Sequence, residues 1–127
     1  MNPPILDEKH NPWIVLNVKL SVPTNIKCLI DTGFSGGIAL PKYYFSLLSQ
    51  KIPVTYEKFE FANGDQDEFA IYSVRVKCMK NAFDIRTMFI DNGVPLVGIS
   101  FLKRYNFGMN IPHEKIGLSD YVKVSEL

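Results

Sequence analysis

The sequence predicts an all-β fold, and three observations carry this prediction. Apolar residues alternate with a mixed set along residues 13–20 and again along 83–90, which is the period of a strand with one buried face. Asn63-Gly64 lies between two strand-like segments, where this dipeptide is a strong hairpin signal. Only two short segments have the features of a helix. A closed or folded-over β-barrel with one or two short helices is therefore expected.

Each expected element is bounded by a recognisable signal. Strands are expected where apolar, β-branched and aromatic residues cluster between turn residues. Pro41 is expected to open a short helix over 42–50, because proline is favoured at the first helical position, and 99–104 can form one or two helical turns. The expected turns, apart from Asn63-Gly64, are 22–25, 80–81 and 91–93. The expected strands are 13–20, 26–30, 38–40, 54–61, 69–79, 83–90, 95–98, 107–111 and 116–118.

The length and composition fit one domain. The chain has 127 residues, of which 46% are hydrophobic and 21% charged, so it has enough apolar side chains for a core and is not expected to be disordered. Residues 1–12 contain three prolines and no periodicity, so we expect an N-terminal arm there and a single domain over 13–127. No internal repeat is visible.

The charge balance gives no reason to expect nucleic acid or an anionic membrane as a partner. The formal net charge is +1, and Lys and Arg are scattered along the chain. The apolar runs are too short to span a bilayer, and residues 1–10 do not resemble a signal peptide, so a cytoplasmic location is expected. Cys28 and Cys78 lie in apolar segments and are expected to be buried, reduced thiols.

The triplet Asp31-Thr32-Gly33 is the candidate for chemistry. It follows the apolar strand 26–30, and glycine with a small hydroxyl residue allows a tight turn that holds the carboxylate at the strand end. A second apolar strand that ends in glycine, Leu96-Val97-Gly98, comes later in the chain. The triplet alone is a weak signal, and it gains weight from this order of elements.

In these residues the chain resembles the retropepsin-like (clan AA) aspartic peptidases, in particular their small standalone bacterial and archaeal members. Position 34 is Phe, where retroviral members usually carry Ala. The standalone bacterial members often have Phe there, so we interpret it as a mark of that subfamily, and the shape of the substrate pocket stays open. The resemblance spans roughly residues 12–118. The segments that carry it are the acidic loop 29–36, the strand and proline 38–41, the hairpin tip 61–65 and the apolar segment 94–102.

The resemblance implies an aspartic endopeptidase that acts as a homodimer on polypeptides, with half an active site in each chain. Asp31 would be the catalytic residue, Thr32 would brace the paired loops, and Gly33 would let the backbone turn closely. The implied support of this loop is Leu96, Val97 and Gly98. The implied flap over the substrate is Phe61, Ala62, Asn63, Gly64 and Asp65.

The chemistry agrees with a half-site. Hydrolysis of a peptide bond without a metal or a nucleophile needs one carboxylate to take a proton from water and a second carboxyl group to donate one. Two carboxyl groups held close together share a proton, as is established for the aspartic peptidase pair. The chain has one Asp-Thr-Gly and no Asp-Ser-Gly, so a two-fold dimer is the simplest way to complete the site.

Other interpretations stay open at this point. The fold could serve as an inactive dimerisation or peptide-binding module, Asp31 could be a turn residue, and Asn63-Gly64 could be an ordinary surface hairpin. The acidic residues near that hairpin do not fit a calcium loop. His10 and His113 are isolated in the sequence, so neither a metal site nor a cofactor is expected.

Overall fold

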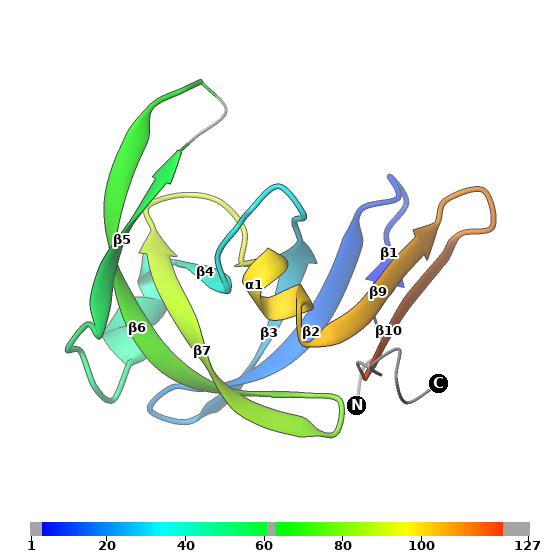
Figure 1. Cartoon of the computed structure of the whole chain (residues 1–127). Coiled ribbons are helices and arrows are strands. Elements are labelled where there is room, and N and C mark those ends of the chain that lie inside the picture. Colours follow the sequence, from blue (N-terminus) through cyan, green and yellow to red (C-terminus); the bar gives the residue numbers. More distant parts are fainter. Residues whose placement is uncertain (1–3, 61–62, 121–127) are drawn as a thin grey trace, which may run out of the picture.

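Strands dominate the chain (Figure 1). The computed structural model describes residues 4–60 and 63–120. Its helices are the 3-10 helix η1 (Lys42–Leu47) and α1 (Ile99–Leu102). The strands are β1 (Ile5–Leu6), β2 (Pro12–Lys19), β3 (Pro23–Ile30), β4 (Ile38–Pro41), β5 (Thr55–Glu60), β6 (Gln66–Cys78), β7 (Asn81–Ile90), β8 (Leu96–Val97), β9 (Tyr105–Asn110) and β10 (Lys115–Asp120). The all-β prediction is confirmed.

Eight strands form one sheet in the order β1-β2-β3-β8-β4-β7-β6-β5, while β9 and β10 form a separate antiparallel pair. A second pairing of β2 with β6, through Asn17↔Lys77 and Val18↔Val76, bends the large sheet into a partial ring. Strand β8 lies between β3, to which it runs parallel, and β4, to which it runs antiparallel. The predicted barrel-like, folded-over sheet is therefore what the chain forms.

The side chains that alternate along the sequence lie by turns on the inner and the outer face of this ring. Along β2, Ile14, Leu16 and Val18 are at most 2% exposed, as expected for side chains at every second position of a strand.

A second, smaller apolar cluster lies apart from this core. Its buried members are Ala39, Ile71 and Met88, and the half-buried side chains packed against them are Phe34, Phe59, Phe69, Ile90 and Leu96.

Several element boundaries differ from those predicted. Strand β3 begins at Pro23, inside the predicted turn, because proline can occupy the first position of a strand. Helix η1 ends at Leu47 and is a 3-10 helix. Strands β9 and β10 are each longer than predicted and pair along their whole length. Within the predicted N-terminal arm, β1 pairs with the start of β2.

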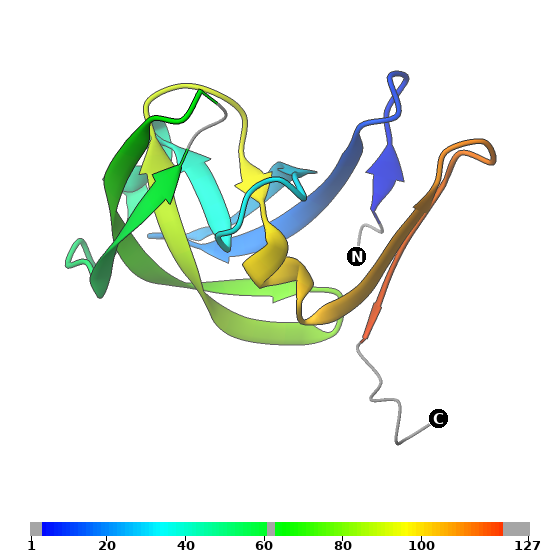
Figure 2. The ribbon, with the colours of Figure 1, turned by 45° about the horizontal axis from the view of Figure 1, so that its top comes forward.

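Two hairpins flank the loop that carries Asp31. In Figure 1 the β5–β6 hairpin rises on one side of the molecule and the β9–β10 hairpin on the other, with the β3–β4 loop between them. Figure 2 shows the same order from a second direction. No helix in the described part of the chain is long and apolar enough to cross a membrane. The cytoplasmic location stays a prediction.

Candidate active site

Asp31 stands directly after β3, at the point where β3 lies beside β8. The parallel register pairs Ile30 with Val97, and the backbone N–H of Asp31 donates a hydrogen bond of 2.9 Å to the carbonyl oxygen of Val97. Val97 is fully buried. The position of Asp31 is therefore fixed by the sheet, although the residue itself is in a loop.

The tight turn after Asp31 orients its carboxylate. The N–H of Gly33 donates to Oδ1 of Asp31 at 2.9 Å, and the N–H of Phe34 donates to its backbone carbonyl at 3.1 Å. Asp31 is half-buried, so the carboxylate remains accessible from solvent. Thr32, the next residue, is exposed.

Helix α1 holds the far end of the same loop. The N–H of Ile99 donates to the carbonyl of Phe34 at 2.8 Å, and the N–H of Gly98 donates to the carbonyl of Gly37 at 2.8 Å. A Cβ at Gly98 would lie 2.4 Å from the carbonyl oxygens of both Phe34 and Gly36. Only glycine fits at this close approach of two backbones.

A groove of about 520 Å³ opens beside the Asp31 carboxylate. We call it the main groove. The smaller apolar cluster forms its floor, so one set of side chains both packs the base of the β5–β6 hairpin and faces the groove. Its apolar lining includes Phe34, Ala39, Phe59, Phe69, Met88 and Leu96.

The charged residues of the main groove are acidic. Asp31, Glu60, Asp67 and Asp91 line it, and none of the other described residues that line it is basic. Lys42 Nζ lies 3.9 Å from Asp91 Oδ1, and both of these side chains are well exposed. The groove therefore combines an apolar floor with an acidic rim.

The tip of the β5–β6 hairpin closes with a side-chain turn. The amide of Asn63 donates to Asp65 Oδ2 at 3.0 Å, and the N–H of Asp65 donates back to Asn63 Oδ1 at 3.0 Å. Gly64 has a φ of +87°, which favours glycine. These three residues are not among the described residues lining the main groove. Phe61 and Ala62, also expected in the flap, lie outside the described residues.

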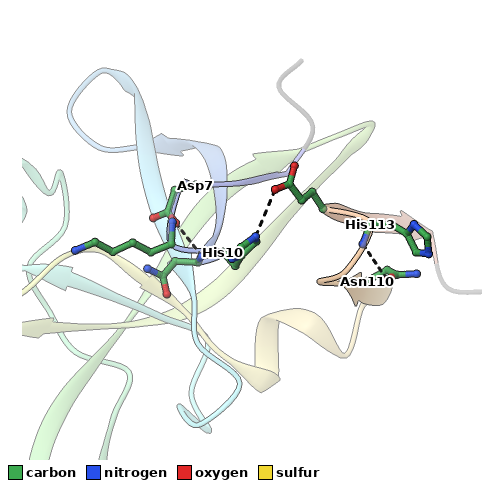
Figure 3. Close-up of polar contacts among 7 residues, drawn as sticks. Asp7, His10, Asn110 and His113 are labelled. Carbon is green, nitrogen blue, oxygen red and sulfur yellow. Dashed lines mark hydrogen bonds and ion pairs between the residues drawn. The ribbon is translucent and has the colours of Figure 1, made fainter.

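A second groove, of about 430 Å³, lies on the other side of Asp31. This side groove is lined by the turn between β1 and β2, by the end of β3 and by β9; its residues are His10, Asn11, Pro12, Leu29, Ile30, Asp31, Thr32, Phe107 and Met109. Figure 3 shows the β1–β2 turn facing the β9–β10 hairpin, where His10 Nε2 lies 3.5 Å from Glu114 Oε1. Asp31 therefore lies between two open grooves.

Asp7 organises the β1–β2 turn that borders the side groove. Its carboxylate accepts hydrogen bonds from the N–H groups of Lys9 and Asn11 and from the indole of Trp13. The bond from Trp13, followed by that from Asn11, lowers the pKa of Asp7 to about 2. This role of Asp7 was not predicted, because residues 1–12 were expected to form an arm without periodic structure.

The sequence-predicted residues divide into two groups. Asp31, Gly33 and Leu96 come together at the main groove. Val97 and Gly98 hold the Asp31 loop through backbone hydrogen bonds. The predictions for the groove walls were incomplete, since Phe59, Phe69 and Met88 lie far from the triplet in the chain. Only their alternation within strands could have indicated that they share a face.

Among the described residues, Asp31 is the one carboxylate that the loop after β3 holds at the groove, whereas Glu60 and Asp67 belong to the β5–β6 hairpin and Asp91 follows β7. No group of three or more His, Cys, Asp or Glu side chains with the geometry of a metal site occurs among the described residues. A single carboxylate can take a proton or donate one, but it cannot do both in the same step. The arrangement is therefore suited to acid–base chemistry shared with a second acidic group.

Comparison with solved structures identifies the fold. A retropepsin-like aspartic protease from Rickettsia conorii is similar with a TM-score of 0.69 and 21% identity over 92% of this chain and 88% of that one. The EIAV protease in complex with the inhibitor HBY-793 has a TM-score of 0.55 and 16% identity, covering 76% of this chain and 89% of that one.

The Simian Foamy Virus (mac) protease is similar with a TM-score of 0.53 and 13% identity over 72% of this chain and 91% of that one. No family model matches the sequence, and no curated protein matches it. At these identities the likeness concerns the fold, which is retropepsin-like, as the sequence predicted.

Proposed function

We propose, from this retropepsin-like fold and from the surroundings of Asp31, that the chain is an aspartic endopeptidase active as a homodimer. The observation that carries the proposal is that the half-buried Asp31 carboxylate, held by the N–H of Gly33 at 2.9 Å, borders the main groove. A groove with an apolar floor suits a polypeptide. The accessible carboxylate suits the activation of water.

The homodimer follows from the chemistry of one Asp31 per chain. A second copy related by a two-fold axis would bring its own Asp31 to the same place, because an isologous interface apposes the same surface of both subunits. One carboxylate would then take a proton from water while the other, protonated, donates to the scissile carbonyl oxygen. Two carboxyl groups so close share one proton, as in known aspartic peptidase pairs.

The loop residues have matching roles in this proposal. Gly33 orients the carboxylate through its N–H. Thr32 is exposed beside Asp31, so its hydroxyl is available for a hydrogen bond to the second subunit. Leu96, Val97 and Gly98 hold the loop at the end of β3. Asn63, Gly64 and Asp65 would move toward the groove when the hairpin closes over substrate.

The test is to compare the wild type with Asp31→Asn. Both proteins are incubated with a broad library of peptides from acidic to neutral pH, and cleavage is read by mass spectrometry. Sedimentation velocity measures the dimer, and circular dichroism measures the fold. We expect Asp31→Asn to keep the fold and the dimer and to lose cleavage, and we expect pepstatin to bind the wild type.

Two outcomes would contradict the proposal. Full cleavage by Asp31→Asn would exclude Asp31 as the catalytic residue. A wild type that cleaves no peptide yet binds peptides in the main groove would favour the alternative, an inactive peptide-binding module on the same fold.

A further inference from the structure

The charged side chains of the main groove come from separate parts of the chain. Glu60 and Asp67 belong to the β5–β6 hairpin, Asp91 follows β7 and Asp31 follows β3. All of them are carboxylates, and none of the other described residues that line the groove is basic. The negative charge of the groove therefore results from the folding of the sheet and not from a run of acidic residues in the sequence.

The carboxylates at the rim are open to a cation from outside the chain. Glu60 and Asp67 form no ion pair with any other described residue. Asp91 meets the ammonium group of Lys42, whose Nζ lies 3.9 Å from its Oδ1, but Lys42 is not among the described residues that line the groove. Because both side chains are well exposed, this pair is weak and can be replaced. Lys42 also shows that an ammonium group can reach this part of the rim.

The floor of the groove beside these carboxylates is apolar. Phe59 lies opposite Asp67 in the register of the hairpin, so the two side chains point to the same face. The ring of Phe59 contacts those of Phe34 and Phe69, with centroids 5.7 and 6.0 Å away. Met88 also lines the groove. A side chain that enters the groove therefore meets carbon atoms on the floor and carboxylates at the rim.

Two neutral polar residues, Ser35 and Asn92, complete the lining of the groove. The hydroxyl oxygen of Ser35 and the amide oxygen of Asn92 can each accept a hydrogen bond, and both residues are exposed. Together with the carboxylates they suit a group that donates several N–H bonds and accepts none, such as an ammonium or a guanidinium. A metal ion fits less well, since no group of three or more His, Cys, Asp or Glu side chains among the described residues has the geometry to hold one.

We propose that the main groove selects a lysine or arginine side chain of the polypeptide substrate, with the stem on the apolar floor and the charged end at Asp67 and Asp91. The inference rests on the proposed function and names a substrate side chain close to the bond that is cleaved. Lysine and arginine combine an apolar stem with a cationic end, as the floor and the rim require. An acidic side chain would be repelled by the same carboxylates.

The chain as a whole does not attract basic peptides. Its formal net charge is +1, so a preference for lysine and arginine has to come from the local field of the groove, where carboxylates of several elements converge. Asp67 and Asp91 are exposed to solvent. Their attraction for a cation should therefore weaken as salt is added, whereas an apolar contact with the floor should not.

The chain offers a matched control for each of these carboxylates. Asp67→Asn and Asp91→Asn remove a charge and keep the shape of the side chain. Glu68→Gln is the control for Asp67, because neighbouring residues of a strand point to opposite faces and Glu68 is not among the described residues of the groove. Asp84→Asn is the control for Asp91, because it removes a carboxylate of β7 that pairs with Arg75 outside the groove.

The experiment measures binding separately from cleavage. Asp31→Asn is the parent, and it is combined with the pair Asp67→Asn and Asp91→Asn or with one of the two controls. Each protein is panned near neutral pH against a displayed library of random peptides, at low and at high sodium chloride, and the bound sequences are counted. Circular dichroism confirms that each variant is folded. Cleavage sites of the wild type, and of the same substitutions with Asp31 intact, are mapped in parallel by mass spectrometry.

We expect lysine and arginine to be enriched among the peptides that the parent binds at low salt. Removing the charges of Asp67 and Asp91 should lower this enrichment about fivefold, the upper end of the effect of one exposed ion pair, and high salt should lower it in the parent as well. Glu68→Gln and Asp84→Asn should leave it unchanged. In the wild type, lysine or arginine should occur beside the cleaved bonds.

Three results overturn the inference: no enrichment of lysine and arginine with the parent, the same enrichment without the charges of Asp67 and Asp91, or an equal loss in either control. If the wild type cleaves peptides without this preference, the peptidase proposal stands and the inference fails. If binding behaves as expected while the wild type cleaves nothing, the specificity stands and the peptidase proposal fails.

Discussion

The N–H of Asp31 donates a hydrogen bond to the carbonyl of Val97 at 2.9 Å, although the two residues are far apart in the sequence. Val97 is completely buried and is paired with Ile30 on one side and Ile38 on the other. The candidate acid is thus attached to the inner strand of the sheet. Changes that disturb β8 should move Asp31 as directly as changes in its own loop.

Gly98→Ala is the sharpest disturbance of this attachment. Its Cβ would lie 2.4 Å from the carbonyl oxygens of Phe34 and Gly36, so α1 and the Asp31 loop would have to separate. We expect a loss of about 1–3 kcal/mol in the free energy of unfolding, as for other overpacked sites. Urea denaturation followed by circular dichroism measures it, and any peptidase activity should fall with it.

Gly108→Ala is the control for this substitution. Nothing lies within 4 Å of a Cβ built at Gly108, which is exposed on β9, so its free energy of unfolding should change by no more than about 0.5 kcal/mol. Equal losses in the two variants would mean that the close approach at Gly98 is unimportant.

The turn around Asp7 should make the stability depend on acid. The indole of Trp13 and the N–H of Asn11 lower the pKa of Asp7 from 3.8 to about 2. A folded-state pKa below the ordinary one means that the ionised group stabilises the fold above about pH 4, and that this contribution disappears as the pH falls to about 2. Asp7→Asn should therefore be less stable than the wild type near neutral pH, with a difference that shrinks between these two values.

Urea titrations of both proteins at several pH values measure that difference. Fluorescence is a convenient signal because Trp13 is the single tryptophan of the chain. Asp84→Asn removes a carboxylate from an exposed pair with Arg75 and should change the stability less, because exposed pairs contribute little. A difference for Asp7→Asn that is constant with pH would contradict the role of the ionised carboxylate.

The sequence predicted what depends on local pattern. The alternation in β2, the Asn63-Gly64 turn and the glycine after Leu96-Val97 each follow from short-range rules, and all three are present in the fold. The resemblance of the acidic loop then allowed the whole fold to be predicted. Boundaries were less accurate, as at β3, because a proline can start a strand as well as form a turn.

The groove could not be predicted in the same way. Phe34, Phe59 and Met88 come from a loop, β5 and β7, and they share a wall only because the sheet folds over. The register that places Asp67 opposite Phe59 is equally invisible in the chain order. Asp7 was missed because its partner, Trp13, lies on the adjoining strand, and a single aspartate in a proline-containing segment carries no pattern.

The two cysteines should be unreactive in the folded protein. Both are buried thiols, as the sequence predicted. Burial, with a smaller contribution from nearby Cys78, raises the pKa of the Cys28 thiol to about 12, so almost no thiolate is present at pH 8. Iodoacetamide should label neither residue in the native state and both in urea, as read by mass spectrometry. Labelling of Cys28 in the native protein at pH 8 would contradict its burial.

Mixing of subunits tests whether the active site needs Asp31 from both chains. Wild type and Asp31→Asn are combined in equal amounts and incubated until the subunits have exchanged. If a dimer with one Asp31 is inactive and pairing is random, activity falls to about one quarter of that of pure wild type at the same total concentration, whereas subunits that act alone retain about one half.

The control for this experiment is a mixture of wild type with Asp84→Asn, which removes a carboxylate of the exposed pair with Arg75, away from both grooves. This mixture should keep the full activity, because every dimer in it has two copies of Asp31. A value near one half with Asp31→Asn, measured in a solution shown by sedimentation to be dimeric, would mean that each chain is catalytically complete. The interpretation of Asp31 as half of a site would then be wrong, even if the chain were a peptidase.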